Sequence, residues 1–117
     1  MRRLLPLAAV LALVLPPTAF ALLSATKLSG TTGPGFTITL KKAGKKVTAL
    51  KPGKYTITVS DKSSSHNFVL TGPGVSKQVT GLGFVGTKTA TVTLKRGKYT
   101  YFCTPHKPHM KGSFTVR

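Results

Sequence analysis

Apolar and polar residues alternate with a period of two along most of this chain, and that alternation limits its possible folds more than any other feature. The alternation starts at Phe36 and continues to the last residues. Its apolar members are Phe36, Ile38 and Leu40; Tyr55, Ile57 and Val59; Phe68 and Leu70; Ala90, Val92 and Leu94; and Phe114 with Val116. Alternation rich in β-branched and aromatic residues is typical of strands buried on one face. Beyond the N-terminal apolar stretch no segment has helical periodicity, so we predict an all-β domain.

Turn signals rich in glycine and proline separate the predicted strands. They are Ala43-Gly44, Pro52-Gly53, Gly72-Pro73-Gly74, Gly81 to Gly86, and Arg96-Gly97. Short strands at this spacing favour an antiparallel sandwich or barrel. Residues 50–56 also resemble residues 94–100, and each segment predicts a strand, a tight turn and a second strand. We interpret the two segments as equivalent hairpin corners of one sandwich.

The first residues have the order of a secretory signal peptide. Arg2 and Arg3 precede an apolar run over 4–15, and Ala19-Phe20-Ala21 offers a cleavage site of small residues. We therefore predict an exported protein, periplasmic or extracellular. An uncleaved membrane anchor is the alternative, because residues 4–23 carry no charge and are long enough to span a bilayer.

These features divide the chain into three parts. Residues 1–21 are predicted to be the signal peptide. Residues 22–35, rich in Ser, Thr and Gly, are expected to form a flexible lead-in. Residues 36–117 are expected to form one domain, since the remaining length allows no second core.

The chain carries 18 lysines and arginines against one acidic residue, Asp61, and its formal net charge is +17. Such a charge attracts acidic proteins, anionic envelope polymers, lipid headgroups or nucleic acid. One carboxylate cannot form the paired-carboxylate site of a glycoside hydrolase or an oxygen-rich cage for calcium or magnesium. These classes of enzyme and of metal site are therefore excluded.

The residues that bind soft metals gather in two short segments. Past the predicted cleavage site, every histidine, cysteine and methionine lies either in Ser65-His66-Asn67-Phe68 or in Cys103-Thr104-Pro105-His106-Lys107-Pro108-His109-Met110. Cys103 is the only cysteine of the chain. A lone thiol in an oxidising compartment is open to oxidation unless it is buried or bound to a metal.

The two segments can direct their side chains to one point. Cys103 shares a strand face with Tyr101, and prolines at 105 and 108 restrict the loop that follows. His66 starts a strand of its own and can turn into the sandwich. Two imidazoles and one thiolate with a weak axial methionine are the ligands of blue copper sites, so we predict one copper ion. Zinc is the alternative metal, although zinc sites more often have a second cysteine or an open water position.

The motifs resemble those of the cupredoxins, and most closely the plastocyanin, pseudoazurin and amicyanin branch. The resemblance rests on Ser65-His66-Asn67-Phe68, on Tyr101-Phe102-Cys103-Thr104-Pro105-His106 and on Met110, and it runs from about Phe36 to Arg117. It implies an antiparallel Greek-key β-sandwich with copper near one end. It also implies three strong ligands, His66, Cys103 and His106. Met110 would be the long axial ligand, and Asn67 would support the site by hydrogen bonding toward Thr104.

The loop departs from the family pattern at one point. Three residues separate His106 from Met110, whereas plastocyanin-like loops have four and amicyanin-like loops have two. His109, beside Met110, is therefore the alternative axial ligand, and a histidine there would bind copper more strongly.

The resemblance implies a type 1 (blue) copper protein that carries single electrons. Lys107 and Lys111 would make the mouth of the site basic, so we expect acidic redox partner proteins. We expect a monomer with no nucleic-acid partner and no membrane span after cleavage. Four ligands leave no open position for a substrate, so we predict no enzymatic activity. Two alternatives stay open: a copper-binding or delivery protein without redox turnover, and a metal-free basic domain that binds polyanions.

Overall fold

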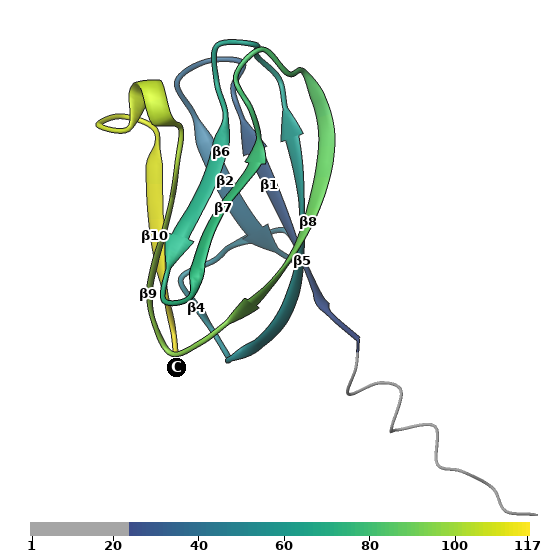
Figure 1. Ribbon diagram of the computed structural model, residues 1–117, viewed down its shortest axis with the longest axis vertical. Helices are drawn as coiled ribbons and strands as arrows, with labels where there is room; N and C mark the ends of the chain where they lie inside the picture. The colour runs from purple at the N-terminus through teal and green to yellow at the C-terminus, as the bar shows by residue number, and fades with distance from the viewer. Residues whose placement is uncertain (1–23) are drawn as a thin grey trace, which may run out of the picture.

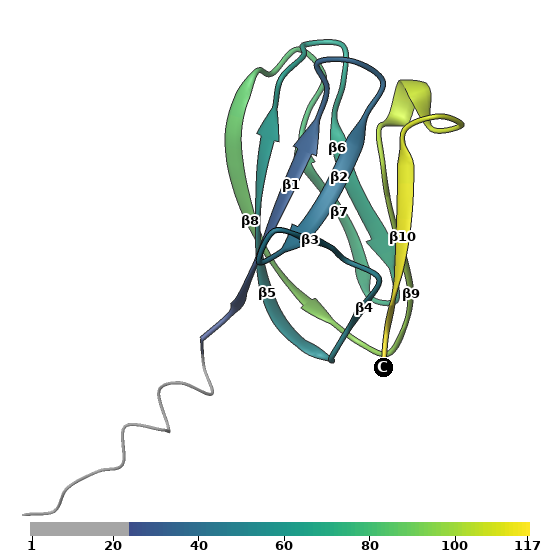
Figure 2. The same ribbon diagram turned by 180° about the vertical axis from the view of Figure 1, so that it is seen from behind.

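The computed structural model describes residues 24–117, which form a sandwich of two five-stranded β-sheets (Figures 1 and 2). The first sheet has the order β3-β2-β1-β5-β8, with β1 (Thr26–Thr32), β2 (Ile38–Lys42), β3 (Lys45–Lys46), β5 (Gly53–Asp61) and β8 (Gly86–Leu94). The second has the order β4-β10-β9-β6-β7, with β4 (Ala49–Leu50), β6 (Phe68–Gly72), β7 (Val75–Thr80), β9 (Gly97–Phe102) and β10 (Lys111–Val116). One 3₁₀ turn, η1 (Thr104–His106), is the only helical segment in this range. The predicted all-β sandwich is confirmed.

The core lies between the sheets and follows the period-two alternation. Along β5, Tyr55, Ile57 and Val59 are buried, and the residues between them are exposed or half-buried. From the facing sheet, the Phe68 ring stacks on the Tyr101 ring with their centroids 5.7 Å apart. The apolar faces predicted from the sequence therefore meet in one core.

The sheets are mixed and not wholly antiparallel as expected. β1 runs parallel to β5, and β10 runs parallel to β4. Between the two strands of each parallel pair, the chain leaves the sheet, contributes to the other sheet, and then returns to form the second strand. Alternation in a sequence shows which residues face inward, but it carries no information about strand direction.

The described part of the expected flexible lead-in, residues 24–35, is not a flexible segment. Thr26–Thr32 is strand β1, which lies between β2 and β5 with Leu28 and Thr32 buried. The inward position between these two is Gly30, where a Cβ atom would lie 3.0 Å from the Phe68 ring. The strand was missed because only one of its inward side chains is large and apolar. The domain therefore begins before Phe36.

The N-terminal prediction stays untested. The expected signal peptide, residues 1–21, lies outside the described residues. Within residues 24–117 no helix is long and apolar enough to cross a membrane.

The two ends of the sandwich are built differently. One end, uppermost in Figure 1, carries η1 together with the loops that follow β1, β5 and β7. The opposite end carries residues 50–56 and 94–100, which resemble each other in sequence. They are corners, as predicted, but not hairpins, because each takes the chain from one sheet to the other. The loops of the first end bring together the residues described next.

Candidate metal centre

His66 lies at the end of the loop that joins β5 to β6. The loop is fixed by hydrogen bonds: the Ser63 amide donates to the Asp61 carboxylate (3.1 Å), and the His66 amide donates to the Ser63 carbonyl (3.1 Å). Gly33, with φ of 78°, passes so close that a Cβ atom there would lie 2.9 Å from His66 Cδ2. The imidazole is therefore buried, with 3 % of the residue exposed.

Cys103 follows the last residue of β9 and has no exposed surface. The chain then turns through η1 and returns as β10. The Cys103 amide donates to the Met110 carbonyl (3.0 Å), and the His106 amide donates to the Cys103 carbonyl (3.2 Å). These bonds close the loop and bring His106 back over Cys103.

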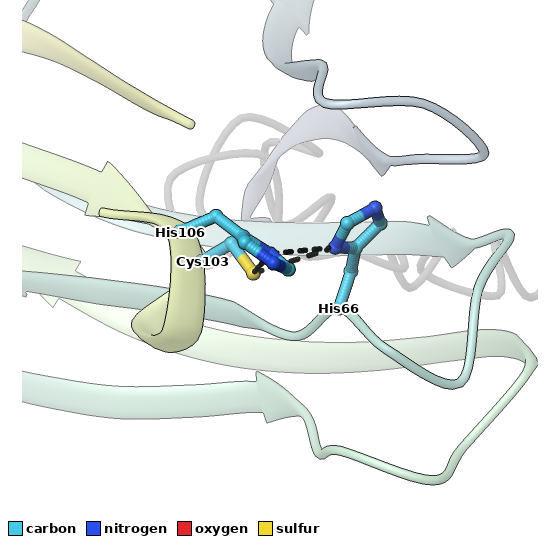
Figure 3. Close-up of side chains that lie close together, drawn as sticks. All are labelled: His66, Cys103 and His106. Carbon is cyan, nitrogen blue, oxygen red and sulfur yellow. Dashed lines mark hydrogen bonds between the residues drawn. The ribbon is translucent and has the colours of Figure 1, made fainter. Parts of the chain in front are cut away.

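Three ligand atoms from the two segments meet at this end of the sandwich (Figure 3). Nδ1 of His66 lies 3.2 Å from Nδ1 of His106. Sγ of Cys103 lies 3.7 Å from the first nitrogen and 3.6 Å from the second. Three atoms at these separations can each lie about 2.0–2.3 Å from a common point, the range of imidazole and thiolate bonds to borderline metal ions.

Asn67 ties the two segments together, as the resemblance implies. The Thr104 amide donates to Asn67 Oδ1 (2.7 Å), and Asn67 Nδ2 donates to the Thr104 hydroxyl (3.0 Å). Asn67 is buried, so neither bond competes freely with water. The pair fixes the position of His66 relative to Cys103 before any metal binds.

Met110 and His109 differ sharply in their surroundings. Met110 has no exposed surface, and it lies outside the cluster of buried residues that fills the space between the sheets. His109 is exposed and makes no part of the His66, Cys103 and His106 cluster. The buried position of Met110, at the end of the loop that carries Cys103 and His106, favours Met110 over His109 as a fourth ligand.

Phe36 is a site residue that sequence reasoning misplaced. Alternation put it on the buried face of a strand, but it precedes β2 and is 64 % exposed. Its ring stands edge-on to the rings of His66 and His106, with centroids 5.8 Å and 4.9 Å away. Phe36 covers the two imidazoles from the solvent side. The signal that could have indicated this is Gly33-Pro34-Gly35, which predicts a loop immediately before Phe36.

Tyr101 lies on β9, two residues before Cys103, which directly follows that strand. It is almost fully buried against Phe68. Burial raises the pKa of its phenol, and a backbone hydrogen bond at Leu40 lowers that pKa by less. The phenol is therefore neutral at physiological pH and adds no charge to the core.

Comparison with known families decides what this cluster is. The sequence profile of the family described as copper binding proteins, plastocyanin/azurin family, matches residues 37–117. The chain belongs to the plastocyanin/azurin family. Copper is the metal that this family binds, and the cluster of two imidazoles and one buried thiolate fits one copper ion.

Solved structures of the same fold include rusticyanin and auracyanin A. A Met148Gln mutant of rusticyanin has a TM-score of 0.55 at 22 % identity, over 78 % of this chain and 76 % of that one. Auracyanin A, a "blue" copper protein from Chloroflexus aurantiacus, has a TM-score of 0.55 at 19 % identity, over 80 % of this chain and all of that one. At this identity the likeness concerns the fold. No curated protein matches the chain in sequence.

Proposed function

We propose that this protein is a type 1 copper protein that carries single electrons between redox partners. His66, Cys103 and His106 are its strong ligands, and Met110 is the axial one. The observation that supports this best is the approach of two imidazole nitrogens and one thiol sulfur to within 3.7 Å of one another at a buried end of the sandwich. Bound copper supplies one-electron exchange by alternating between Cu(I) and Cu(II).

The chain's own residues keep the ligands in fixed positions and exclude water from the two sulfur atoms. Cys103 and Met110 are fully buried, so water has no direct access to either sulfur. The Asn67–Thr104 hydrogen bonds keep the two ligand segments together, so little movement accompanies a change of charge at the site. His106 is the only half-buried member of the cluster, and it is where a partner protein can come closest.

We propose an acidic redox partner that meets the protein at this end. Lys107 follows His106 directly and is exposed, and its Nζ lies 4.4 Å from the centre of the Phe102 ring. Lys111 is exposed at the start of β10. Basic side chains around the mouth steer acidic partners toward it, and salt screens that attraction. We also propose that the protein is exported to the periplasm or the exterior and that it is a monomer.

Spectroscopy of the copper-loaded protein tests the assignment. Addition of Cu(II) should give a strong thiolate-to-copper charge-transfer band in the visible spectrum and a matching paramagnetic resonance signal. Both should vanish on reduction and return on oxidation. Cys103→Ser should remove the band, because the band needs the thiolate. A wild-type protein that binds Cu(II) without such a band would refute a type 1 site.

The axial ligand is tested with a matched pair of variants. Met110→Ala should change the absorption and resonance spectra of the copper-loaded protein, whereas His109→Ala should leave them as they are. The reverse outcome would assign the axial position to His109.

A delivery role makes a different prediction from electron carriage. A carrier keeps its metal through repeated cycles of reduction and oxidation, so Cu(I) should stay bound in the presence of a competing thiol chelator of moderate affinity. Rapid loss of Cu(I) to that chelator, with slow redox cycling, would favour delivery.

A further inference from the structure

A cavity of about 650 Å³ lies at the end of the sandwich opposite the metal cluster. Its lining includes Ser24, Lys42, Lys51, Lys54, Tyr55 and Arg117. Lys54 is the second residue of β5, and Asp61, near the metal end, is its last. A strand of this length separates the two ends by about 25 Å. The cavity is therefore distinct from the copper site.

The lysines of this cavity have no acidic side chain to balance them. Asp61 is the only acidic residue of the chain, and it is buried at the far end of β5. Lys42 also stands directly opposite Lys45 in the pairing of β2 with β3. Like charges placed opposite each other destabilise a sheet, and a bound anion relieves that repulsion.

Protection of a sheet edge does not explain why lysines stand at positions 51 and 54. Lysines on an edge strand discourage pairing with other chains, which explains Lys45 and Lys46 on β3. Lys54, however, lies on β5, an interior strand between β1 and β8, and Lys51 lies in the corner before it. Both are exposed and border the cavity. Their placement favours an anion at this end.

The basic surface extends beyond the cavity across the whole end. Gly53 pairs with Leu94, and Val116 pairs with both Leu50 and Gly97, so the two corners lie side by side. The second corner adds three exposed cations, Lys95, Arg96 and Lys98. An array of this breadth matches an extended anionic surface better than one small soluble anion.

We propose that this cavity and the two corners around it bind the phosphate groups of anionic lipids at a membrane surface. Ser24, the first of the described residues, also lines the cavity. A protein bound in this way holds its copper end away from the membrane and open to redox partners. The binding does not depend on copper, so the proposal stands apart from the proposed electron carriage.

Vesicle binding tests the proposal. The protein beginning at Ser24 contains every strand of both sheets, and it should cosediment at low ionic strength with vesicles of phosphatidylglycerol and phosphatidylcholine but not with phosphatidylcholine alone. The double variant Lys51→Glu/Lys54→Glu should bind on the order of thirtyfold more weakly, because each lysine near an anionic surface contributes about fivefold. The control Lys77→Glu/Lys88→Glu has the same net charge and changes residues outside the cavity, so it should lose at most about threefold.

Three outcomes would overturn the proposal. Equal losses in the two double variants would mean that net charge alone drives the binding. Absence of binding to the anionic vesicles would exclude the membrane as the source of the phosphate. Shifts of the Lys51 and Lys54 nuclear resonance signals with inorganic phosphate, without vesicle binding, would assign the cavity to a soluble anion. Thermal melting of each variant, measured alongside, separates a lost site from a lost fold.

Discussion

Asn67 is the residue on which the geometry of the metal centre depends most directly. Asn67→Ala removes both hydrogen bonds to Thr104 and frees the His66 segment from the Cys103 segment. Loss of such an outer partner typically lowers metal affinity 10–100-fold. We expect a fall of about that size in competitive copper titrations, and a loss of about 1–3 kcal/mol in the free energy of unfolding of the metal-free protein.

Thr104→Ala is the matched control for Asn67→Ala. It removes the hydroxyl bond but keeps the stronger bond from the Thr104 amide to Asn67 Oδ1. Its effect on copper affinity and on stability should therefore be clearly smaller. If Asn67→Ala bound copper as tightly as the wild type, the link between the segments would have no part in holding the site.

Phe36 should influence the copper site without supporting the fold. Its ring is mostly exposed, so Phe36→Ala should change the free energy of unfolding by no more than about 0.5 kcal/mol. Removal of the ring uncovers His66 and His106, and a more polar surrounding favours the more highly charged Cu(II). The reduction potential, measured by redox titration, should therefore fall. Val85→Ala truncates a similarly exposed apolar residue, and an equal shift there would contradict a specific role for Phe36.

The ligand residues could be found from the sequence because their chemistry is local. Cys103, His106 and Met110 lie within eight residues, and His66 is the only histidine elsewhere in the chain. The position of Phe36 could not be found in this way. Alternation continues smoothly through Phe36 and Ile38. Gly33-Pro34-Gly35 predicts a loop before Phe36, but it does not show that this loop includes Phe36 and that the strand begins at Ile38.

At the scale of elements, the corners at residues 50–56 and 94–100 fix how the chain passes between the sheets, and each corner contains a tyrosine. In each corner a tyrosine hydroxyl bonds to the backbone of the lysine four residues earlier: Tyr55 donates to the Lys51 carbonyl (2.6 Å), and Tyr99 accepts from the Lys95 amide (2.9 Å). Tyr99 also donates to the Pro73 carbonyl (2.7 Å). Tyr99 therefore joins three segments and Tyr55 only two.

This difference predicts unequal costs for two identical substitutions. Tyr99→Phe leaves two backbone groups without their partner and should cost about 1–3 kcal/mol, whereas Tyr55→Phe breaks one bond and should cost about 0.5–1.5 kcal/mol. Urea unfolding measures both. The copper spectrum should not change in either variant, because the corners lie at the opposite end from the site. A larger cost at Tyr55 would contradict this account of the corners.

Elements were predictable where their inward side chains are large. The repeated corner sequence was recognised, yet the sequence could not show that each corner changes sheets, because a tight turn has the same composition in a hairpin. β1 was missed for a related reason. Its inward position Gly30 is small because the Phe68 ring occupies the space, so the feature that makes the strand fit also hides it from pattern analysis.

For the whole molecule, the main electrostatic feature is the excess of positive over negative side chains. The positive side chains behind the net charge of +17 repel one another in the folded state. One close pair among them is Lys41 and Lys46, which stand opposite each other on β2 and β3. Salt screens such interactions over about 10 Å at 0.1 M. We expect the melting temperature of the metal-free protein to rise between low and moderate sodium chloride concentrations. A fall in melting temperature would mean that repulsion is not the main electrostatic term.

Lys46→Glu separates the local repulsion from the global one. It places a carboxylate opposite Lys41, and an opposite-charge pair in place of a like-charge pair should add about 0.2–1 kcal/mol to the free energy of unfolding. Lys77→Glu makes the same change in net charge, but Lys77 pairs with the apolar Leu70, so only the global part of the gain should remain. Urea unfolding at low salt should show the larger gain for Lys46→Glu, and at high salt the two variants should converge because screening removes both terms. Equal gains at low salt would mean that the cross-strand lysines do not interact, and that the stability of this protein responds to its total charge alone.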